Sequence, residues 1–154
     1  MDLAECLPLF LNEITNPTVT EVEQMIRLFP CTTYEQVAPF ITPPKTSLNY
    51  GRNVIYSSER FEVIVLNLPP FTETPIHDHG ESFCCVKIIK GTVHNRIFEI
   101  SSPQPTLIRE EKYITDDYFT VTTDQIHSMY NPANEALITF HIYTPPIQNN
   151  QFYR

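Results

Sequence analysis

Two histidines of the segment 74–79, His77 and His79, stand two positions apart in the chain. On an extended strand this spacing puts both imidazoles on the same face. A third histidine, His127, lies much later in the chain beside its own strand pattern, so that it can complete a three-histidine face. Three neutral nitrogens leave about half of the positions of an octahedral metal open. The pattern therefore predicts a divalent metal site that binds a substrate and dioxygen side by side.

The composition is that of a globular protein with enough chain for a hydrophobic core. Apolar residues make up 42% of the 154 residues, and the formal net charge is -8. This charge argues against nucleic acid and anionic membranes as partners. No apolar run is long enough to span a bilayer, and acidic residues stand near the N-terminus where a signal peptide has basic ones. We expect a single domain over residues 1–154, a cytoplasmic location and a monomer.

The cysteines bear on the chemistry in two ways. In a reducing compartment we expect all of them to be free thiols. Cys84 and Cys85 are adjacent and cannot bridge without strain. Cys6 and Cys31 fall in helical segments, where we expect them to serve as packing residues.

The elements that must position the histidines begin with a helical segment, residues 1–48. Apolar residues between Val22 and Phe29 recur at intervals of three and four, and Pro30 ends the run. Two capping boxes, each with a glutamate three positions after a threonine, are predicted to open two helices. They are Thr20 with Glu23 and Thr32 with Glu35. Residues 2–14 are a weaker helical candidate.

From Tyr50 onward the pattern changes to short β-rich runs separated by turn signals. The predicted strands are Asn53–Ser57, Phe61–Asn67, Phe83–Lys90, Thr92–Ile100, Tyr118–Thr122 and Ala136–Tyr143. Several short strands at regular spacing are typical of a sandwich or a barrel. We therefore expect a mostly β protein in which residues 49–148 form a barrel and the helical segment packs on one side of it.

The ordered motifs resemble those of cupin barrels. His77-x-His79 followed by Gly91 resembles the first cupin motif, and His127-x-x-x-Asn131 resembles the second. Cupins usually place a glutamate ligand four or five residues after the second histidine, where this chain has Phe83 and Cys84. A cupin with three histidines and a cysteine in that slot resembles the cysteine dioxygenase family. Two flanking segments, 50–53 and 141–146, also resemble this family, and the arginine at position 52 resembles its arginine-type bacterial members.

The resemblance implies a cupin barrel, that is, a double-stranded β-helix, that uses Fe(II) and dioxygen to oxidise the thiol of L-cysteine to a sulfinate. It implies His77, His79 and His127 as the metal ligands. It implies Arg52 and Tyr50 as the residues that bind the substrate carboxylate. Finally, it implies a catalytic group of a phenol, a histidine that holds it and a cysteine that can be joined to it by a thioether bond. These residues are Tyr143, His141 and Cys84.

Several positions depart from the family pattern or from simple alternation. Thr139 stands where the family usually has a serine, and it keeps the hydroxyl. Strict alternation from His77 would point Cys85 into the barrel, whereas the resemblance requires Cys84. A bulge or bend at Gly80 would shift the phase by one residue. Two further polar residues are expected to have no part in the chemistry: Asp78 in a structural role and His94 on the surface.

The alternatives differ in substrate or in class. A related thiol, such as 3-mercaptopropionate or cysteamine, is an alternative substrate. A related branch of the family with glutamine in place of Arg52 acts on thiol acids that lack the amine. A non-catalytic cupin that binds a small ligand through a metal, as a sensor or storage module, is the alternative class. Three histidines also suit zinc, nickel or cobalt.

Overall fold

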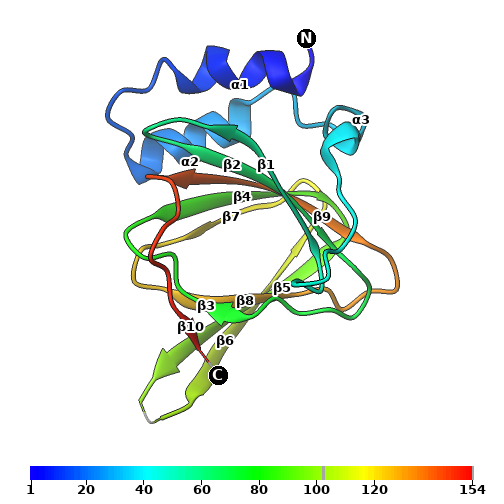
Figure 1. Cartoon of the computed structure of the whole chain (residues 1–154), viewed down its shortest axis with the longest axis vertical. Coiled ribbons are helices and arrows are strands. Elements are labelled where there is room, and N and C mark those ends of the chain that lie inside the picture. Colours follow the sequence, from blue (N-terminus) through cyan, green and yellow to red (C-terminus); the bar gives the residue numbers. More distant parts are fainter. Residues whose placement is uncertain (102, 154) are drawn as a thin grey trace.

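The computed structural model describes residues 1–101 and 103–153, which form two β-sheets with helices at the N-terminal side. One five-stranded sheet has the order β1-β2-β9-β4-β7, and the other has the order β10-β3-β8-β5-β6. The two sheets face one another as the walls of a barrel (Figure 1). Their strands are β1 Gly51–Ser57, β2 Glu62–Leu68, β3 Ile76–His77, β4 Phe83–Lys90, β5 Thr92–Ile100, β6 Pro105–Ile114, β7 Tyr118–Val121, β8 Ile126–Tyr130, β9 Leu137–Thr144 and β10 Phe152–Tyr153.

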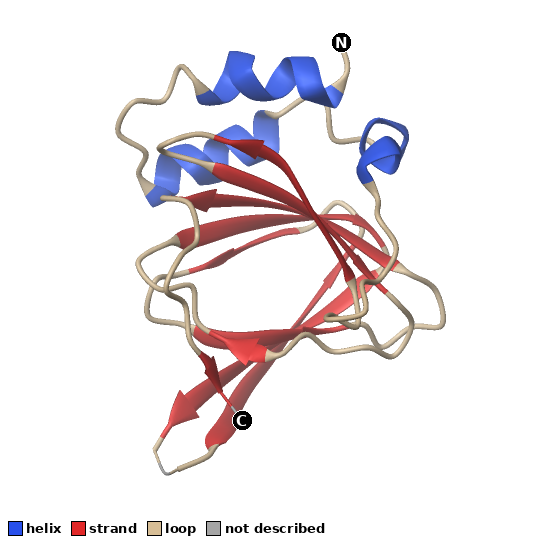
Figure 2. Cartoon of the chain, in the orientation of Figure 1, coloured by secondary structure: helices blue, strands red, loops and turns tan. Residues whose placement is uncertain are grey.

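The helices lie over the outer face of the first sheet, as Figure 2 shows. They are α1 Leu3–Leu11, α2 Val19–Leu28, the single turn α3 Tyr34–Val37 and a 3-10 turn over Ala38–Phe40. No helix among the described residues is long and apolar enough to cross a membrane. The predicted helical layer on one side of the barrel is therefore present, and the weak candidate at residues 2–14 is a helix despite Pro8 within it.

The predicted helix caps were wrong by one or two residues. The N-cap of α2 is Thr18, whose side chain accepts a hydrogen bond from the backbone N–H of Glu21, so the predicted cap Thr20 lies inside α2. The N-cap of α3 is Thr33, not the predicted Thr32, and it forms a capping box with Gln36. At both places the chain has two overlapping threonine patterns with the same spacing to an acid or amide. Spacing alone does not separate them, and the packing of the helix decides.

Two hydrophobic clusters divide the interior. One fills the space between the helices and the first sheet, and the other fills the barrel. Strand β2 contributes to both by alternation, because Val63 and Val65 face the helices while Ile64 and Leu66 face the barrel. This alternation assigns each position of β2 to the helix layer or to the barrel lumen.

The expectation that all cysteines are free was wrong for Cys6 and Cys31, which form a disulfide. It joins α1 to the residues just after α2, and the two Cα atoms lie 6.5 Å apart. The two cysteines are far apart in sequence, and the packing of α1 against α2 brings them together. Cys84 and Cys85 are free thiols, as predicted.

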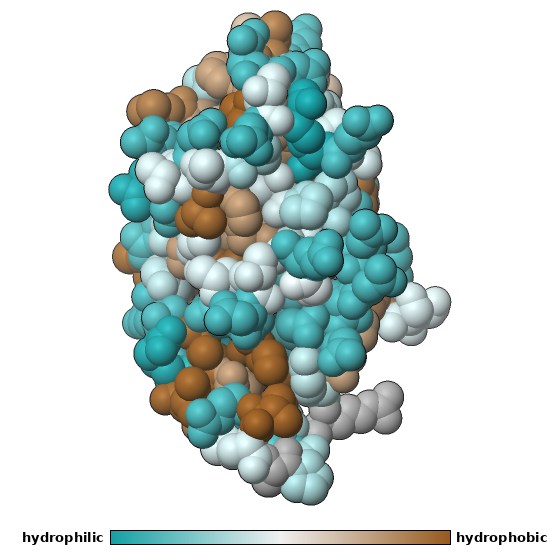
Figure 3. Space-filling view, turned by 90° about the vertical axis from the view of Figure 1, so that its left-hand side faces the viewer, coloured by the Kyte–Doolittle hydropathy of each residue, from teal (hydrophilic) through white to brown (hydrophobic). Residues whose placement is uncertain are grey.

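The six predicted strands are all present. Two have the predicted ends, and the ends of the other four differ by one or two residues. The predicted strands did not include β3, β6, β8 or β10, although His127 on β8 was expected beside a strand pattern. Strand β6 is an edge strand with mostly exposed side chains, so it lacks the alternation of apolar residues that reveals a half-buried strand. Hydrophobic residues on the surface gather toward the end of the molecule that carries the β5–β6 hairpin and the C-terminal strand (Figures 1 and 3).

Candidate metal centre and substrate cavity

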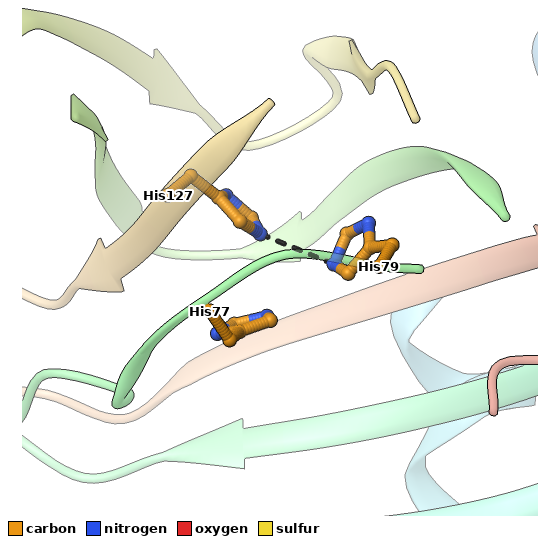
Figure 4. Close-up of side chains that lie close together, drawn as sticks. All are labelled: His77, His79 and His127. Atoms are coloured by element: carbon orange, nitrogen blue, oxygen red, sulfur yellow. Dashed lines mark hydrogen bonds between the residues drawn. The ribbon is translucent and has the colours of Figure 1, made fainter. Parts of the chain in front are cut away.

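The three histidines predicted from the sequence lie together inside the barrel. His77 is on β3 directly opposite His127 on β8, and His79 follows β3 in the chain. One ligand atom from each lies within 4.8 Å of the others. The side chains of all three converge on one point, and the Nε2 atoms of His79 and His127 are 3.2 Å apart (Figure 4). The strand pairing therefore builds the three-histidine face that the spacing predicts.

Hydrogen bonds orient two of the rings so that one nitrogen of each stays available. Nδ1–H of His77 donates to the carbonyl oxygen of Pro75 at 2.6 Å, and Nδ1–H of His127 donates to Oδ1 of Asn95 at 2.7 Å. Both acceptors are oxygen atoms, so the proton sits on Nδ1 and the Nε2 lone pair is free. Such outer hydrogen bonds are how proteins fix the tautomer of a metal-binding histidine.

Asn95 was missed by the sequence interpretation. It lies on β5 at an inward position between buried Val93 and Ile97, and it is itself buried. A polar amide among inward-facing apolar residues of a strand is a signal that could have identified it, because a buried amide needs a partner.

All three imidazoles are neutral at physiological pH. Burial lowers the pKa of His79 to about 3, and the nearby His77 adds to the effect. Burial also lowers the pKa of His77 and, well below its usual value, that of His127. The Nδ1 of His79 is buried without a hydrogen-bond partner among the described residues. Neutral rings with facing lone pairs form a set that a divalent cation would satisfy, so the residues fit a metal centre.

A cavity of about 190 Å³ opens onto this cluster. Its lining includes four further side chains that the resemblance singled out, namely Tyr50, Arg52, His141 and Tyr143, together with His77 and His127. Cys84 and His79 are not among the lining residues. Burial raises the pKa of Tyr143 well above its usual value, with the Cys84 thiol next in effect, so the phenol keeps its proton at neutral pH. Six of the eight sequence-predicted site residues thus line one small cavity.

Cys84 faces the barrel and Cys85 faces the helices. Cys84 packs in the barrel cluster with Tyr143, whereas Cys85 packs in the cluster beneath the helices. The chain bends at Gly80, where φ is +60°, so the alternation that begins at His77 does not continue into β4. The orientation required by the resemblance is present, and strict alternation was the wrong guide.

His141 sits between three groups of the site. Its Nε2 lies 2.7 Å from Oγ1 of Thr139, and its Nδ1 lies 3.7 Å from Sγ of Cys84. Its ring is nearly parallel to that of Tyr143, at 9° and with 5.9 Å between centroids. The hydroxyl retained at Thr139 therefore does bond to the histidine, and His141 contacts the phenol by ring packing.

Asp78 has the structural role that the alternation predicted. Its side chain accepts hydrogen bonds from the backbone of Gly80 and Gln151, at 3.0 and 2.9 Å, and from the hydroxyl of Tyr153 at 2.7 Å. It thereby anchors the C-terminal strand β10 beside His77, since Phe152 pairs with His77 in the sheet. His94, expected at the surface, faces Glu110 on the outer side of the second sheet.

The C-terminal residues were not anticipated as part of the site. Ile147, Asn150 and Phe152 line the cavity, and the ring of Phe152 lies 6.0 Å from that of His77. The sequence offered no signal here, because the segment has no strand-length apolar run. The position of this C-terminal segment follows from the hydrogen bonds that Gln151 and Tyr153 donate to Asp78.

Comparison with known proteins gives a family match over most of the chain. Residues 17–154 match the model of the family described as cysteine dioxygenase type I. Cysteine dioxygenase type 1 of Rattus norvegicus is 23% identical over 103 residues, which cover 63% of this chain and 52% of that protein. Plant cysteine oxidase 2 of Arabidopsis thaliana is 34% identical over 83 residues, which cover 52% of this chain and 29% of that protein. The chain thus spans about half, or less, of the length of these curated relatives.

The fold comparison agrees with the predicted architecture. A double-stranded β-helix protein from Klebsiella pneumoniae, described as an uncharacterized conserved protein, superposes with a TM-score of 0.65 at 16% identity. The match covers 77% of this chain and 94% of that chain. The predicted fold class, a mostly β cupin barrel with an N-terminal helical layer, is confirmed.

Proposed function

Because the chain belongs to the cysteine dioxygenase type I family, we propose that it oxidises the thiol of L-cysteine to cysteine sulfinate with dioxygen and Fe(II). The observation that carries this proposal is the three-histidine cluster opening onto a cavity that also holds Arg52 and Tyr143. The cavity, at about 190 Å³, suits a small thiol. The reaction adds both atoms of one dioxygen to one sulfur, so no external reductant is needed.

We assign the metal to His77, His79 and His127. Bound there, Fe(II) would supply the positive charge that favours the substrate thiolate and the redox chemistry that activates dioxygen. The protein contributes neutral ligands, so that the full charge of the ion acts on the substrate. Asn95 and the carbonyl of Pro75 hold two of these rings in place.

Arg52 would bind the substrate carboxylate. Its guanidinium is a planar fork that can donate two parallel hydrogen bonds to a carboxylate. It lies on β1 at the position opposite Leu66, whose side chain faces the barrel, so its own side chain shares that face. Tyr50, on the same cavity wall, would donate a further hydrogen bond. Together they would orient the thiol toward the histidines.

Tyr143 would hold a proton near the reacting atoms, since its raised pKa keeps the phenol protonated at neutral pH. His141 packs against its ring and would limit its movement. Cys84 would restrict it further through a thioether bond, formed with loss of two hydrogens that dioxygen accepts.

The test is turnover by iron-loaded protein. With L-cysteine we expect oxygen consumption matched by sulfinate detected by mass spectrometry, in a ratio of about one to one by the stoichiometry above. His127→Ala should lose iron and activity, whereas the matched control His94→Ala, on the outer face of the second sheet, should keep both. Iron binding without oxygen consumption for any of cysteine, 3-mercaptopropionate or cysteamine would instead support a binding module.

A further inference from the structure

We infer that Glu62 is a specificity-determining residue, which sets the charge that Arg52 presents to the substrate and so favours cysteine over thiol acids that lack an amine. The inference rests on the proposed function. The role of Glu62 is one of charge: it acts through Arg52 and by its own charge on the substrate, and it lies outside the lining of the cavity.

Glu62 faces the barrel interior. It begins β2, where alternate residues Ile64 and Leu66 belong to the barrel cluster, so position 62 lies on the same face. In the sheet it is directly opposite Tyr143 on β9, and directly opposed residues share a face. A carboxylate is therefore built into the wall of the lumen, next to the phenol of the site.

The charge partner of this carboxylate is Arg52. Oε1 of Glu62 lies 3.9 Å from Nη2 of Arg52, and the side chains are 17% and 34% exposed. Oε1 is buried and has no hydrogen-bond partner among the described residues. A buried acceptor without a hydrogen bond is costly, and the nearby guanidinium charge compensates part of this cost.

This arrangement leaves the guanidinium available to a ligand. At 3.9 Å the contact is an ion pair and not a hydrogen bond. The N–H groups of Arg52 can therefore donate to a substrate carboxylate while Glu62 remains behind them. The substrate carboxylate must then approach a cation whose charge is partly cancelled, and it is repelled by Glu62 itself.

The repulsion acts unequally on different thiols. 3-Mercaptopropionate brings a carboxylate alone, so it experiences the full unfavourable effect of Glu62. Cysteine brings an ammonium as well, whose attraction to Glu62 offsets part of this effect. Cysteamine brings only an ammonium, so Glu62 favours it. Removing the charge of Glu62 should therefore help the three thiols in the order 3-mercaptopropionate, cysteine, cysteamine.

The experiment compares Glu62→Gln with wild type in two measurements on iron-loaded protein. Calorimetry without oxygen gives Kd for each thiol, and oxygen consumption gives kcat/KM. In Glu62→Gln the preference for cysteine over 3-mercaptopropionate should fall by roughly fivefold to tenfold in both, because a nearby like charge in a partly buried site is worth about that much. Cysteamine should bind no better than before. Glu59→Gln, an exposed acid nearby, is the matched control and should change neither.

Glu62→Asp separates charge from shape, since it keeps the carboxylate and shortens the side chain. It should retain the wild-type order of preference. If Glu62→Asp behaves like Glu62→Gln, or if Glu62→Gln alters all three thiols by the same factor, the inference is overturned. Wild-type protein that binds thiols but forms no sulfinate would refute the proposed function, while the ratios of Kd would still decide the role of Glu62. Wild-type protein that binds no thiol would overturn both.

Discussion

Cys84 and Tyr143 lie directly opposite one another in the ladder between β4 and β9, and both side chains face the barrel lumen. Opposed residues in an antiparallel pair have Cβ atoms about 5 Å apart, so the thiol and the phenol ring are neighbours. The thiol is buried, and burial raises its pKa well above the usual value. Cys84 is therefore a neutral thiol held beside the phenol in the resting site.

We predict that this pair forms a thioether during turnover. Intact-mass analysis of protein incubated with iron, cysteine and oxygen should show the loss of two hydrogens. Cys84→Gly should abolish the change and keep partial activity, because the linkage restrains Tyr143 without taking part in binding. Cys85→Ser, at the neighbouring thiol that faces the helices, is the control and should still form the bond. An unchanged mass after many turnovers would remove the linkage from the mechanism.

We predict that Asn95 supports the metal centre through His127. Asn95→Ala removes the acceptor for Nδ1–H of His127, so the ring loses its fixed tautomer and orientation. Loss of such an outer partner typically lowers metal affinity by about 10- to 100-fold. Competition with a chelator measures this affinity directly.

The control is the thermal unfolding transition of Asn95→Ala compared with that of wild type, which shows whether a loss of metal affinity arises from unfolding. Asn95→Asp, which retains an oxygen acceptor, should recover most of the affinity. Equal affinities for Asn95→Ala and wild type would mean that the hydrogen bond does not position the ligand.

We predict that Arg52 decides which thiol is accepted. Truncating one partner of a charge pair at a partly desolvated site typically costs a few kcal/mol, and about 1.4 kcal/mol corresponds to a tenfold change in rate. Arg52→Gln should therefore reduce kcat/KM for cysteine by roughly two to three orders of magnitude. The loss on 3-mercaptopropionate should be much smaller, in line with the related branch that carries glutamine at this position.

Cysteamine provides the control for Arg52, because it has no carboxylate. Its turnover should be low in wild type and little changed by Arg52→Gln. Equal losses on cysteine and cysteamine would show that Arg52 supports the fold or the metal, and the carboxylate clamp would have to be abandoned.

We predict that the buried histidines make the metal-free protein sensitive to acid. Burial, aided by the neighbouring His79 and by the charge of Arg52, lowers the pKa of His141 to about 3, while its value in the unfolded chain is about 6.5. Between these values the unfolded state binds a proton that the native state does not. The free energy of unfolding therefore falls as the pH falls from about 6.5 toward 3, by up to about 1.4 kcal/mol per pH unit for each such group.

Urea unfolding of metal-free protein at several pH values between 6 and 4 measures this slope. His141→Gln should make the slope shallower, because one such group is gone, whatever its effect on stability at pH 7. His94→Gln, on the outer side of the second sheet, is the matched variant. A slope that is the same in His141→Gln and wild type would contradict the assignment.

Much of the architecture could be predicted from local patterns in the sequence. The two-residue spacing of His77 and His79, the later His127 and the alternating apolar runs are properties of short segments. Local geometry converts them directly into a shared face or a strand. For the same reason the ordered motifs around these histidines were enough to indicate the barrel and the family.

The three-dimensional packing decided what local patterns could not. The bend at Gly80 resets the alternation, so Cys84 and not Cys85 faces Tyr143. Glu62 comes beside Arg52 only through the pairing of β1 with β2. The Cys6–Cys31 disulfide likewise joins residues far apart in the chain, through the packing of the helices. In each case the partners are distant in sequence or separated by a bend. A pattern with a period of two or of 3.6 residues carries no information about which distant residue will stand opposite.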